Sequence, residues 1–219
     1  MSNKMKGFFK MNRREKEMQA RRMHIIKNAA TIFGRDGYEN ASVNEIAKEA
    51  EFTKRTLYKY FNDKADLYLS VLLFKYRQMI DHFENQELKG TTGFEKLRDS
   101  IEKQYKYYLN NTDTFRIMYD IGNVREVTDN EKINEFIKLD SKITETICSL
   151  IELGQKDGSI ANEPISEDMT VSLKFILSAV FDKLAIVGDS YVNHIEKSKD
   201  DFIKDVIDMI LDSIKKTKS

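Results

Sequence analysis

The chain has 219 residues, 41% of them hydrophobic and 33% charged, with a formal net charge of +0, so it can form one large or two small domains. One Pro and nine Gly suit a mostly helical protein, and the single cysteine, Cys148, excludes an intramolecular disulfide and fits a reducing compartment. No apolar run is long enough to span a bilayer, and the first residues lack an apolar segment of signal-peptide length. We therefore expect a soluble cytoplasmic protein without a membrane partner.

The net charge of zero hides a separation between the two ends of the chain. Residues 1–66 carry 15 Lys and Arg against 9 Asp and Glu, and residues 67–219 carry the balancing acidic excess. Many of the cations precede residue 23 and could follow a phosphate backbone or enter a minor groove. A disordered solubilising tail is the preferred reading of Lys4 to Lys10, and a membrane-surface helix around Phe8 and Phe9 is disfavoured because the segment is short. Two domains are expected, over residues 1–66 and 67–219, and the basic part of the chain coincides with the first.

The first predicted helix runs from Arg21 to Phe33, and Gly37 stands where its C-terminus would need a left-handed residue. Its apolar face consists of Ile25, Ile26, Ala29, Ala30 and Phe33. A second helix is predicted from Val43, because Ser42 and Glu45 have the spacing of a capping box. The first helix is expected to support the elements that follow it.

A third short helix is predicted from Lys54 to about Phe61, with Thr53 as its N-cap. Leu57 and Phe61 are four residues apart and are expected to face inward, leaving a cationic and aromatic outer surface. The two helices and the short turn between them form a helix-turn-helix pattern, whose second helix can enter a major groove. Asp63 and Asp66 then predict the cap of another helix, with Lys64 in its first turn.

From Arg21 to about Leu67 the chain resembles the TetR-type transcriptional regulators. The resemblance is carried by an ordered set of residues: Arg21-Arg22, Ile25-Ile26, Ala29-Ala30, Phe33, Gly37, Ser42, Ile46-Ala47, Leu57-Tyr58, Tyr60-Phe61, Lys64 and Leu67. The chain departs from the family at Glu51, where a Gly is usual in the turn. A left-handed conformation there would cost a non-Gly residue roughly 1 kcal/mol, so either the turn differs slightly or the chain tolerates strain.

The resemblance implies an all-α protein that binds double-stranded operator DNA, most often as a repressor. Three side chains are expected closest to base edges: Lys54, Arg55 and Tyr58. Five are expected mainly at phosphates: Ser42, Thr53, Lys59, Tyr60 and Lys64. Tyr60 could instead pack under its helix.

Downstream, three-to-four spacing of apolar residues predicts helices almost throughout. Their expected ranges are Asp66 to about His82, Phe94 to Leu109, Thr114 to Ile121, Ile133 to about Gly154, a helix capped by Ser166 and continuing through Leu184, and Phe202 to Ile214. In the TetR family the last two helices usually join two subunits in a four-helix bundle. A two-fold dimer also suits DNA reading, because one short helix contacts few base pairs.

The expected dimer interface consists of Leu173, Ile176, Leu177, Val180, Phe181, Leu184, Phe202, Val206, Met209 and Ile210. The alternative is that these side chains only close the core of their own subunit. The dimer is the preferred reading.

Aromatic residues between Tyr105 and Tyr119 predict an effector pocket, since a buried Tyr needs a hydrogen-bond partner and a ligand site needs a few polar groups. Its expected residues are Phe74, Tyr105, Tyr108, Phe115, Met118, Tyr119, Phe136 and Phe175. Ordinary core packing would explain most of them. The expected effector is a small lipophilic or aromatic molecule, neutral or cationic because this part of the chain is acidic. The alternative is that the C-terminal domain docks a protein partner.

An enzymatic function is disfavoured, and no cofactor is expected. His24, His82 and His194 lie on separate predicted elements without a ligand partner at metal-binding spacing, and there is no Gly-rich phosphate loop or nucleophile elbow. Cys148 lies on an apolar pattern and is expected to be buried. Asp201, Asp205, Asp208 and Asp212 share one helical face, where nearby lysines favour a solvated surface over a cation site.

Overall fold

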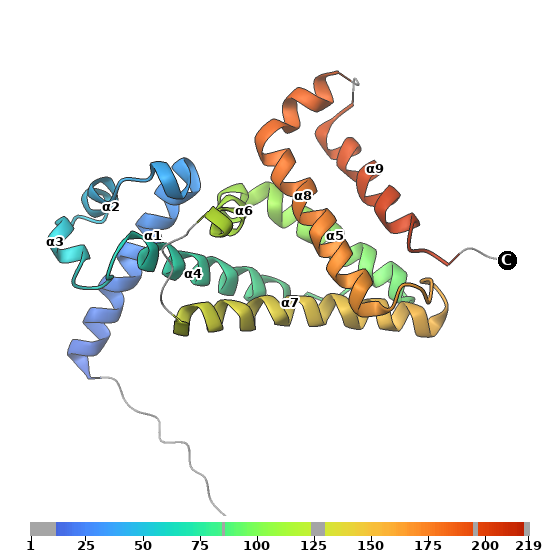
Figure 1. Ribbon diagram of the computed structural model, residues 1–219, viewed down its shortest axis with the longest axis horizontal. Helices are drawn as coiled ribbons and strands as arrows, with labels where there is room; N and C mark the ends of the chain where they lie inside the picture. The colour runs from blue at the N-terminus through green and yellow to red at the C-terminus, as the bar shows by residue number, and fades with distance from the viewer. Residues whose placement is uncertain (1–11, 85, 124–129, 195–196, 217–219) are drawn as a thin grey trace, which may run out of the picture.

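The computed structural model describes residues 12–84, 86–123, 130–194 and 197–216. Within these ranges the fold is helical without a β-strand, as expected from the sequence (Figure 1). The elements are α1 (Arg13–Asn40), α2 (Val43–Glu49), α3 (Lys54–Leu57), α4 (Lys64–Glu84), α5 (Gly93–Asn110), α6 (Thr112–Tyr119), the 3-10 helix η1 (Asp120–Asn123), α7 (Asn130–Asp157), α8 (Ser166–Asn193) and α9 (Lys199–Asp212). No helix in the described part is long and apolar enough to cross a membrane.

The helix α1 begins earlier than the apolar pattern indicated. Asn12 and Glu15 form a capping box, in which the Asn12 side chain accepts from the Glu15 amide and the Glu15 carboxylate accepts from the Asn12 amide. Residues 12–20 are exposed, so this first part of α1 carries no apolar face from which its length could be read. Local capping therefore sets the start of α1, and the core contacts begin at Ile25.

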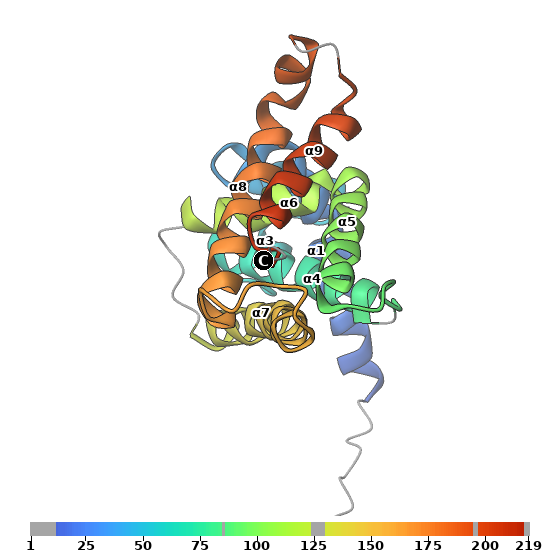
Figure 2. The ribbon, with the colours of Figure 1, turned by 90° about the vertical axis from the view of Figure 1, so that its right-hand side faces the viewer.

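The helices α1 to α3 form a compact head at one end of the molecule, and α4 leads from it into the larger helical body (Figure 1). In the body α7 runs beside α4, α5 passes behind α8 in this view, and α6 lies between α8 and the head. The end of α8 and the start of α9 project beyond the other helices in both views (Figures 1 and 2). The body thus presents the α8–α9 pair at its far side.

Contacts between α1 and the α6–η1 segment join the head to the body. Gly37 has φ +76°, which kinks α1, and the next amide, of Tyr38, donates to Asp120 Oδ2 at 3.0 Å. A Cβ at Gly37 would lie 2.9 Å from that same carboxylate oxygen, so the residue must be small as well as left-handed. Arg116 Nη1 donates to the carbonyl of Arg35 at 2.6 Å. The end of α1 is therefore held by polar contacts from the body.

Two local expectations are wrong in the body. Ser166 is the first residue of α8 and Ile165 is its N-cap, because the Ser166 hydroxyl donates to the Glu167 carboxylate at 3.1 Å rather than accepting from a helix amide. Cys148 is half-buried rather than buried, and its thiol lies 3.8 Å from Glu152 Oε1.

Candidate DNA interface and effector cavity

The helix α2 begins at Val43, as predicted, but not through the predicted capping box. Ser42 has the extended backbone of an N-cap, yet its side chain makes no cap hydrogen bond. The Glu45 carboxylate instead accepts from Arg35 Nη2 at 2.7 Å. A charge-assisted bond to an arginine on α1 therefore replaces the expected return bond to Ser42.

In the turn after α2 the second of the two alternatives holds, in which the chain tolerates a left-handed residue at Glu51. Glu51 has φ +58°, the only positive φ of a non-glycine residue in the described chain. Its amide donates to the Lys48 carbonyl at 3.0 Å, and the Phe52 amide donates to the Ala47 carbonyl at 2.8 Å. This pair of bonds is a Schellman motif with Glu51 at the position that usually needs glycine. The turn keeps its geometry with Glu51 in a strained conformation.

The helix α3 is shorter than predicted. Thr53 is its N-cap, and Thr53 Oγ1 accepts from the Thr56 amide at 3.1 Å, as expected. The α-helix ends at Leu57, and the chain continues to Phe61 in tighter turns. Leu57 and Phe61 are buried, and the guanidinium carbon of Arg22 lies 5.0 Å from the centre of the Phe61 ring. One buried leucine and the following phenylalanine thus anchor a helix of a single turn.

The outer side of this segment is cationic and exposed. Five residues are exposed here: Thr53, Lys54, Arg55, Tyr58 and Lys59, with Tyr58 41% exposed. Lys54 Nζ lies 6.0 Å from the centre of the Tyr58 ring. Because the long side chains stand out from a short rigid turn, they can reach base edges and phosphates together.

Ser42 is also exposed, but two other predicted DNA contacts are less free. Tyr60 is half-buried and packs against the core, which agrees with the alternative that it packs under its helix. Lys64 is half-buried, with its Nζ donating to the Glu39 carbonyl at 3.1 Å and lying 4.7 Å from the centre of the Tyr38 ring. Lys4, Lys6 and Lys10 of the basic tail, with Phe8 and Phe9, lie outside the described residues.

The first turn of α4 joins the head to α7 through one carboxylate. Asp63 Oδ1 accepts from the Asp66 amide at 2.7 Å, as predicted for a cap, and Asp66 Oδ2 accepts from the Asn62 amide at 2.8 Å. The other Asp66 oxygen accepts from Lys132 Nζ on α7 at 2.6 Å. The side chain of Asp66 is 9% exposed, so this ion pair is largely shielded from water.

A cavity of about 320 Å³ lies in the body, among α4, α5, α6, α7 and α8. Three of the predicted effector residues line it: Phe115, Met118 and Phe175. Its polar groups come from Tyr76, Gln104, Asp140, Lys174 and Ser178. The volume is at the lower end of the range for small-molecule sites, about 300–1,000 Å³. The cavity has apolar walls with a few polar groups, which suits a lipophilic ligand.

Four other predicted residues do not line this cavity. Tyr105 donates from its hydroxyl to Asp200 Oδ1 at 2.9 Å, and the rings of Tyr105 and Tyr108 stack on Phe181. The hydrogen-bond partner that a buried tyrosine needs thus comes from α9 rather than from a ligand. Phe136 packs edge-on against Tyr76, with ring centres 5.0 Å apart, and Phe74 is half-buried against the core. The side chain of Tyr119 lies outside the described part.

The polar residues of the cavity were not predicted from the sequence. Lys174 Nζ donates to Asp140 Oδ2 at 2.9 Å and to Thr144 Oγ1 at 2.5 Å. Burial, with a smaller effect of Asp140, raises the pKa of the Tyr76 hydroxyl, so this group keeps its proton. Asp140 and Lys174 belong to different helices and look like ordinary surface charges in the sequence, which contains no signal that joins them.

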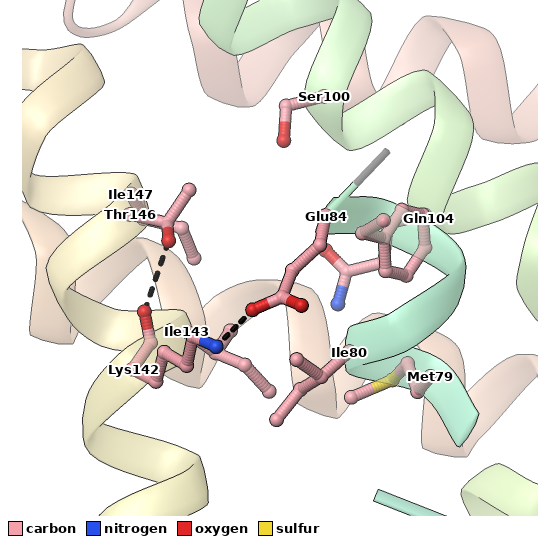
Figure 3. Close-up of a pocket in the computed structure, with 10 residues that line it drawn as sticks. Met79, Ile80, Glu84, Ser100, Gln104, Lys142, Ile143, Thr146 and Ile147 are labelled. Atoms are coloured by element: carbon pink, nitrogen blue, oxygen red, sulfur yellow. Dashed lines mark hydrogen bonds and ion pairs between the residues drawn. The ribbon is translucent and has the colours of Figure 1, made fainter. Parts of the chain in front are cut away.

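A second, smaller cavity of about 130 Å³ adjoins the first (Figure 3). The two share Met79, Gln104, Ile143 and Ile147 in their walls. On the side between α4 and α7, Lys142 Nζ forms an ion pair with Glu84 Oε1, and Figure 3 shows this pair lying across the space. Side chains common to both walls therefore lie between the two spaces.

The residues predicted for a dimer interface divide into two groups. Leu173, Leu177 and Phe181 are buried in their own subunit, so their assignment to a subunit interface is wrong. Ile176 and Met209 are exposed, by 42% and 74%. Val180, Phe202, Val206 and Ile210 are half-buried, and the side chain of Leu184 lies outside the described part. Val171 and Phe175, 64% and 74% exposed, extend the apolar surface of α8.

Among the described residues no three His, Cys, Asp or Glu side chains gather in a way that could hold a metal ion. Asp208 forms an ion pair with Arg98, and Asp205 forms one with Lys197. This row of acids on α9 is therefore charge-compensated by neighbouring cations.

The described helix-turn-helix coincides with a known sequence pattern. The family described as "Bacterial regulatory proteins, tetR family" matches residues 25–71. The fatty acid metabolism regulator protein of Bacillus subtilis is 29% identical over 139 residues, covering 61% of this chain and 72% of that protein. An HTH-type transcriptional regulator of Staphylococcus aureus is 30% identical over 96 residues, 44% of this chain and 52% of its own length, so the alignment spans about half of that relative.

The fold extends the likeness over nearly the whole chain. The transcriptional regulator FadR of Bacillus subtilis, solved in complex with stearoyl-CoA, superposes with a TM-score of 0.65 at 18% identity, over 88% of this chain and 98% of that chain. These findings agree with the capped helix-turn-helix and the helical body described above. Residues 25–71 therefore belong to the TetR family of bacterial regulatory proteins, and the fold of the whole chain is that of its structural neighbours.

Proposed function

We propose that the protein is a repressor that binds a pseudo-palindromic operator as a homodimer and releases it when a lipophilic effector enters the body. The observation that carries the DNA-binding part is the exposed group Thr53, Lys54, Arg55, Tyr58 and Lys59 on a turn anchored by Leu57. Such a group contacts base edges and phosphates at once. A DNA-binding regulator of this kind acts in the cytoplasm.

The proposed dimer forms through the outer faces of α8 and α9. Val171, Phe175 and Ile176 on α8 and Met209 on α9 expose large apolar side chains. An isologous interface would cover them and place two recognition turns on one face of the DNA. Met209→Asp should give monomers in analytical ultracentrifugation. Met18→Asp changes an exposed methionine on α1, outside the proposed interface, and should leave dimers.

The proposed effector is a molecule with an acyl-type chain. The cavity supports a lipophilic ligand because most of its lining is apolar and aromatic. The named role of the Bacillus subtilis relative and the stearoyl-CoA held by the Bacillus subtilis neighbour favour an acyl chain among lipophilic ligands.

The proposed signal passes through α4 and α6. We place the division between the reading and sensing parts at residues 66 and 67, inside the continuous helix α4. Three ion pairs join α4 to α7 in the same order along both helices: Asp66 with Lys132, Arg77 with Glu135, and Glu84 with Lys142. A ligand that separates α7 from α4 would move α4 and with it the head, so the two recognition turns would lose their spacing.

The test uses a labelled duplex from the DNA upstream of the protein's own gene, with a scrambled duplex as control. Fluorescence anisotropy should show two chains per operator, weaker binding at higher salt, and release when stearoyl-CoA is added. Equal affinity for both duplexes would contradict the operator. If a panel of lipophilic compounds left operator binding unchanged, the sensing part would be assigned to a protein partner instead.

A further inference from the structure

The ion pair between Glu84 and Lys142 lies at the side of the smaller cavity, where α4 ends and α7 passes it (Figure 3). Its side chains are 46% and 56% exposed, whereas those of the Asp140–Lys174 pair at the larger cavity are 40% and 26% exposed. A solvent-exposed pair contributes only about 0–1 kcal/mol, so it opens easily. Of the two charged pairs, Glu84–Lys142 is the one that water reaches more freely.

The larger cavity reaches the outer face of α8, where the proposed dimer interface lies. Phe175 lines the cavity and is 74% exposed on the outer face of α8, next to Ile176. A second subunit packed on this face would close that side. With that side closed, the smaller cavity offers a route to the larger one, between Met79, Gln104, Ile143 and Ile147.

The smaller cavity has the two chemical halves that an amphiphile needs. Met79, Ile80, Phe83, Ile143 and Ile147 supply the apolar walls, while Lys142 supplies a cation at the side that opens to water. At about 130 Å³ this space alone is well below the size of a small-molecule site, whereas a chain that also enters the larger space of about 320 Å³ fills both.

We propose, on the basis of the function proposed above, that the Glu84–Lys142 pair is the entrance for an acidic amphiphile whose head group takes Lys142 from Glu84 and whose chain passes Gln104 into the larger cavity. The head group is a carboxylate or a phosphate, as in a free fatty acid or an acyl thioester of coenzyme A. The ligand is therefore acidic, although the body as a whole carries more acidic than basic residues. The charge of one side chain at the entrance outweighs the screened average of the surface.

The first experiment compares palmitate, palmitoyl-CoA and the uncharged methyl palmitate, with binding measured by native mass spectrometry. Lys142→Ala should weaken palmitate binding about tenfold, because a charge-assisted hydrogen bond is lost. Glu84→Gln should tighten it about two- to fivefold by removing a competing carboxylate. Methyl palmitate should respond to neither change. Lys138→Ala, at an exposed lysine one turn earlier on α7, is the matched control.

The relative binding affinities of palmitate and palmitoyl-CoA distinguish the two sources of the acidic head group, a free fatty acid and an acyl thioester of coenzyme A. If both bind the wild type and release operator DNA, yet Lys142→Ala and Glu84→Gln behave like Lys138→Ala, the entrance is overturned while the proposed effector stands. If the wild type binds no acyl compound, the effector and the entrance are both overturned.

A second experiment tests the path of the chain. Gln104→Phe narrows the passage between the cavities, so it should weaken palmitate about tenfold while changing decanoate, whose shorter chain needs less of the larger cavity, by less than about twofold. An equal loss for both acids, or no loss for either, would overturn the path past Gln104. Circular dichroism of the variant checks that the helices remain.

Discussion

The head and the body of this protein are packed in different ways. In the head, Ala29, Ala30, Ala47 and Ala50 are buried in the same core cluster as Leu57, and their short side chains let the helices approach closely. In the body, long and aromatic side chains surround two adjoining cavities. A close-packed part holds a fixed shape, and a part with internal space can rearrange when that space is filled. The comparison teaches that the head, with the proposed DNA contacts, is the stiffer part, and that the body, with the proposed ligand cavity, is the part that can deform.

The largest expected effect comes from a substitution in the core of the head. Leu57→Ala should lower the free energy of unfolding by about 2–5 kcal/mol, because the side chain is fully buried and anchors a one-turn helix. Met118→Ala removes a side chain that already faces the cavity, so it should cost less. Urea denaturation of both variants checks this. A greater loss for Met118→Ala would show that the body is the stiffer part.

The next largest effect concerns DNA binding by the exposed surface of the head. Substitutions there should not change the stability of the fold. Arg55→Ala should cost about 1–3 kcal/mol of operator binding and relax the preference for one base pair. Lys59→Ala should weaken operator and random DNA alike and lower the salt slope by about one unit. Both side chains are exposed, so their melting temperatures should match that of the wild type. Anisotropy titrations at several salt concentrations measure both quantities, and equal losses on operator and random DNA for both variants would end this division of roles.

A third prediction tests the link between the two parts. Lys132→Met should lower the free energy of unfolding by about 1–3 kcal/mol, because it leaves the shielded Asp66 carboxylate without its ammonium partner. It should also reduce the effect of stearoyl-CoA on operator affinity, since α7 would no longer hold the first turn of α4. Lys138→Met on the same helix is the control. An unchanged response to the ligand would show that the link does not depend on the Asp66–Lys132 pair.

The smallest effect relieves strain in the head. Glu51→Gly should raise the free energy of unfolding by up to about 1 kcal/mol, because Glu51 has φ +58° in a Schellman turn. Loss of a negative charge near the DNA should also tighten binding at low salt. Glu49→Gly, inside α2, should destabilise instead. Denaturation curves for the two variants would contradict the assignment if they moved in the same direction.

The features predicted well from the sequence are local. The Thr53 cap, the Asp63 cap and the left-handed turn at Glu51 each depend on hydrogen bonds between residues at most five positions apart. The burial of Leu57 and Phe61 follows from their spacing in one short segment. The capping box at Ser42 failed because Glu45 found a stronger partner, Arg35, on another helix.

The sequence by itself determined the helical class, the starts of α2, α3 and α4, and the exposed cationic turn, because short-range hydrogen bonds and helical periodicity are written in neighbouring residues. Only the tertiary structure decided which apolar residues of α8 face inward. Leu177 and Phe181 are buried while Phe175 and Ile176 are exposed, although all four are large and apolar. The cavity walls likewise come from α4, α5, α6, α7 and α8, and the direction in which each helix turns its face depends on the others packed around it.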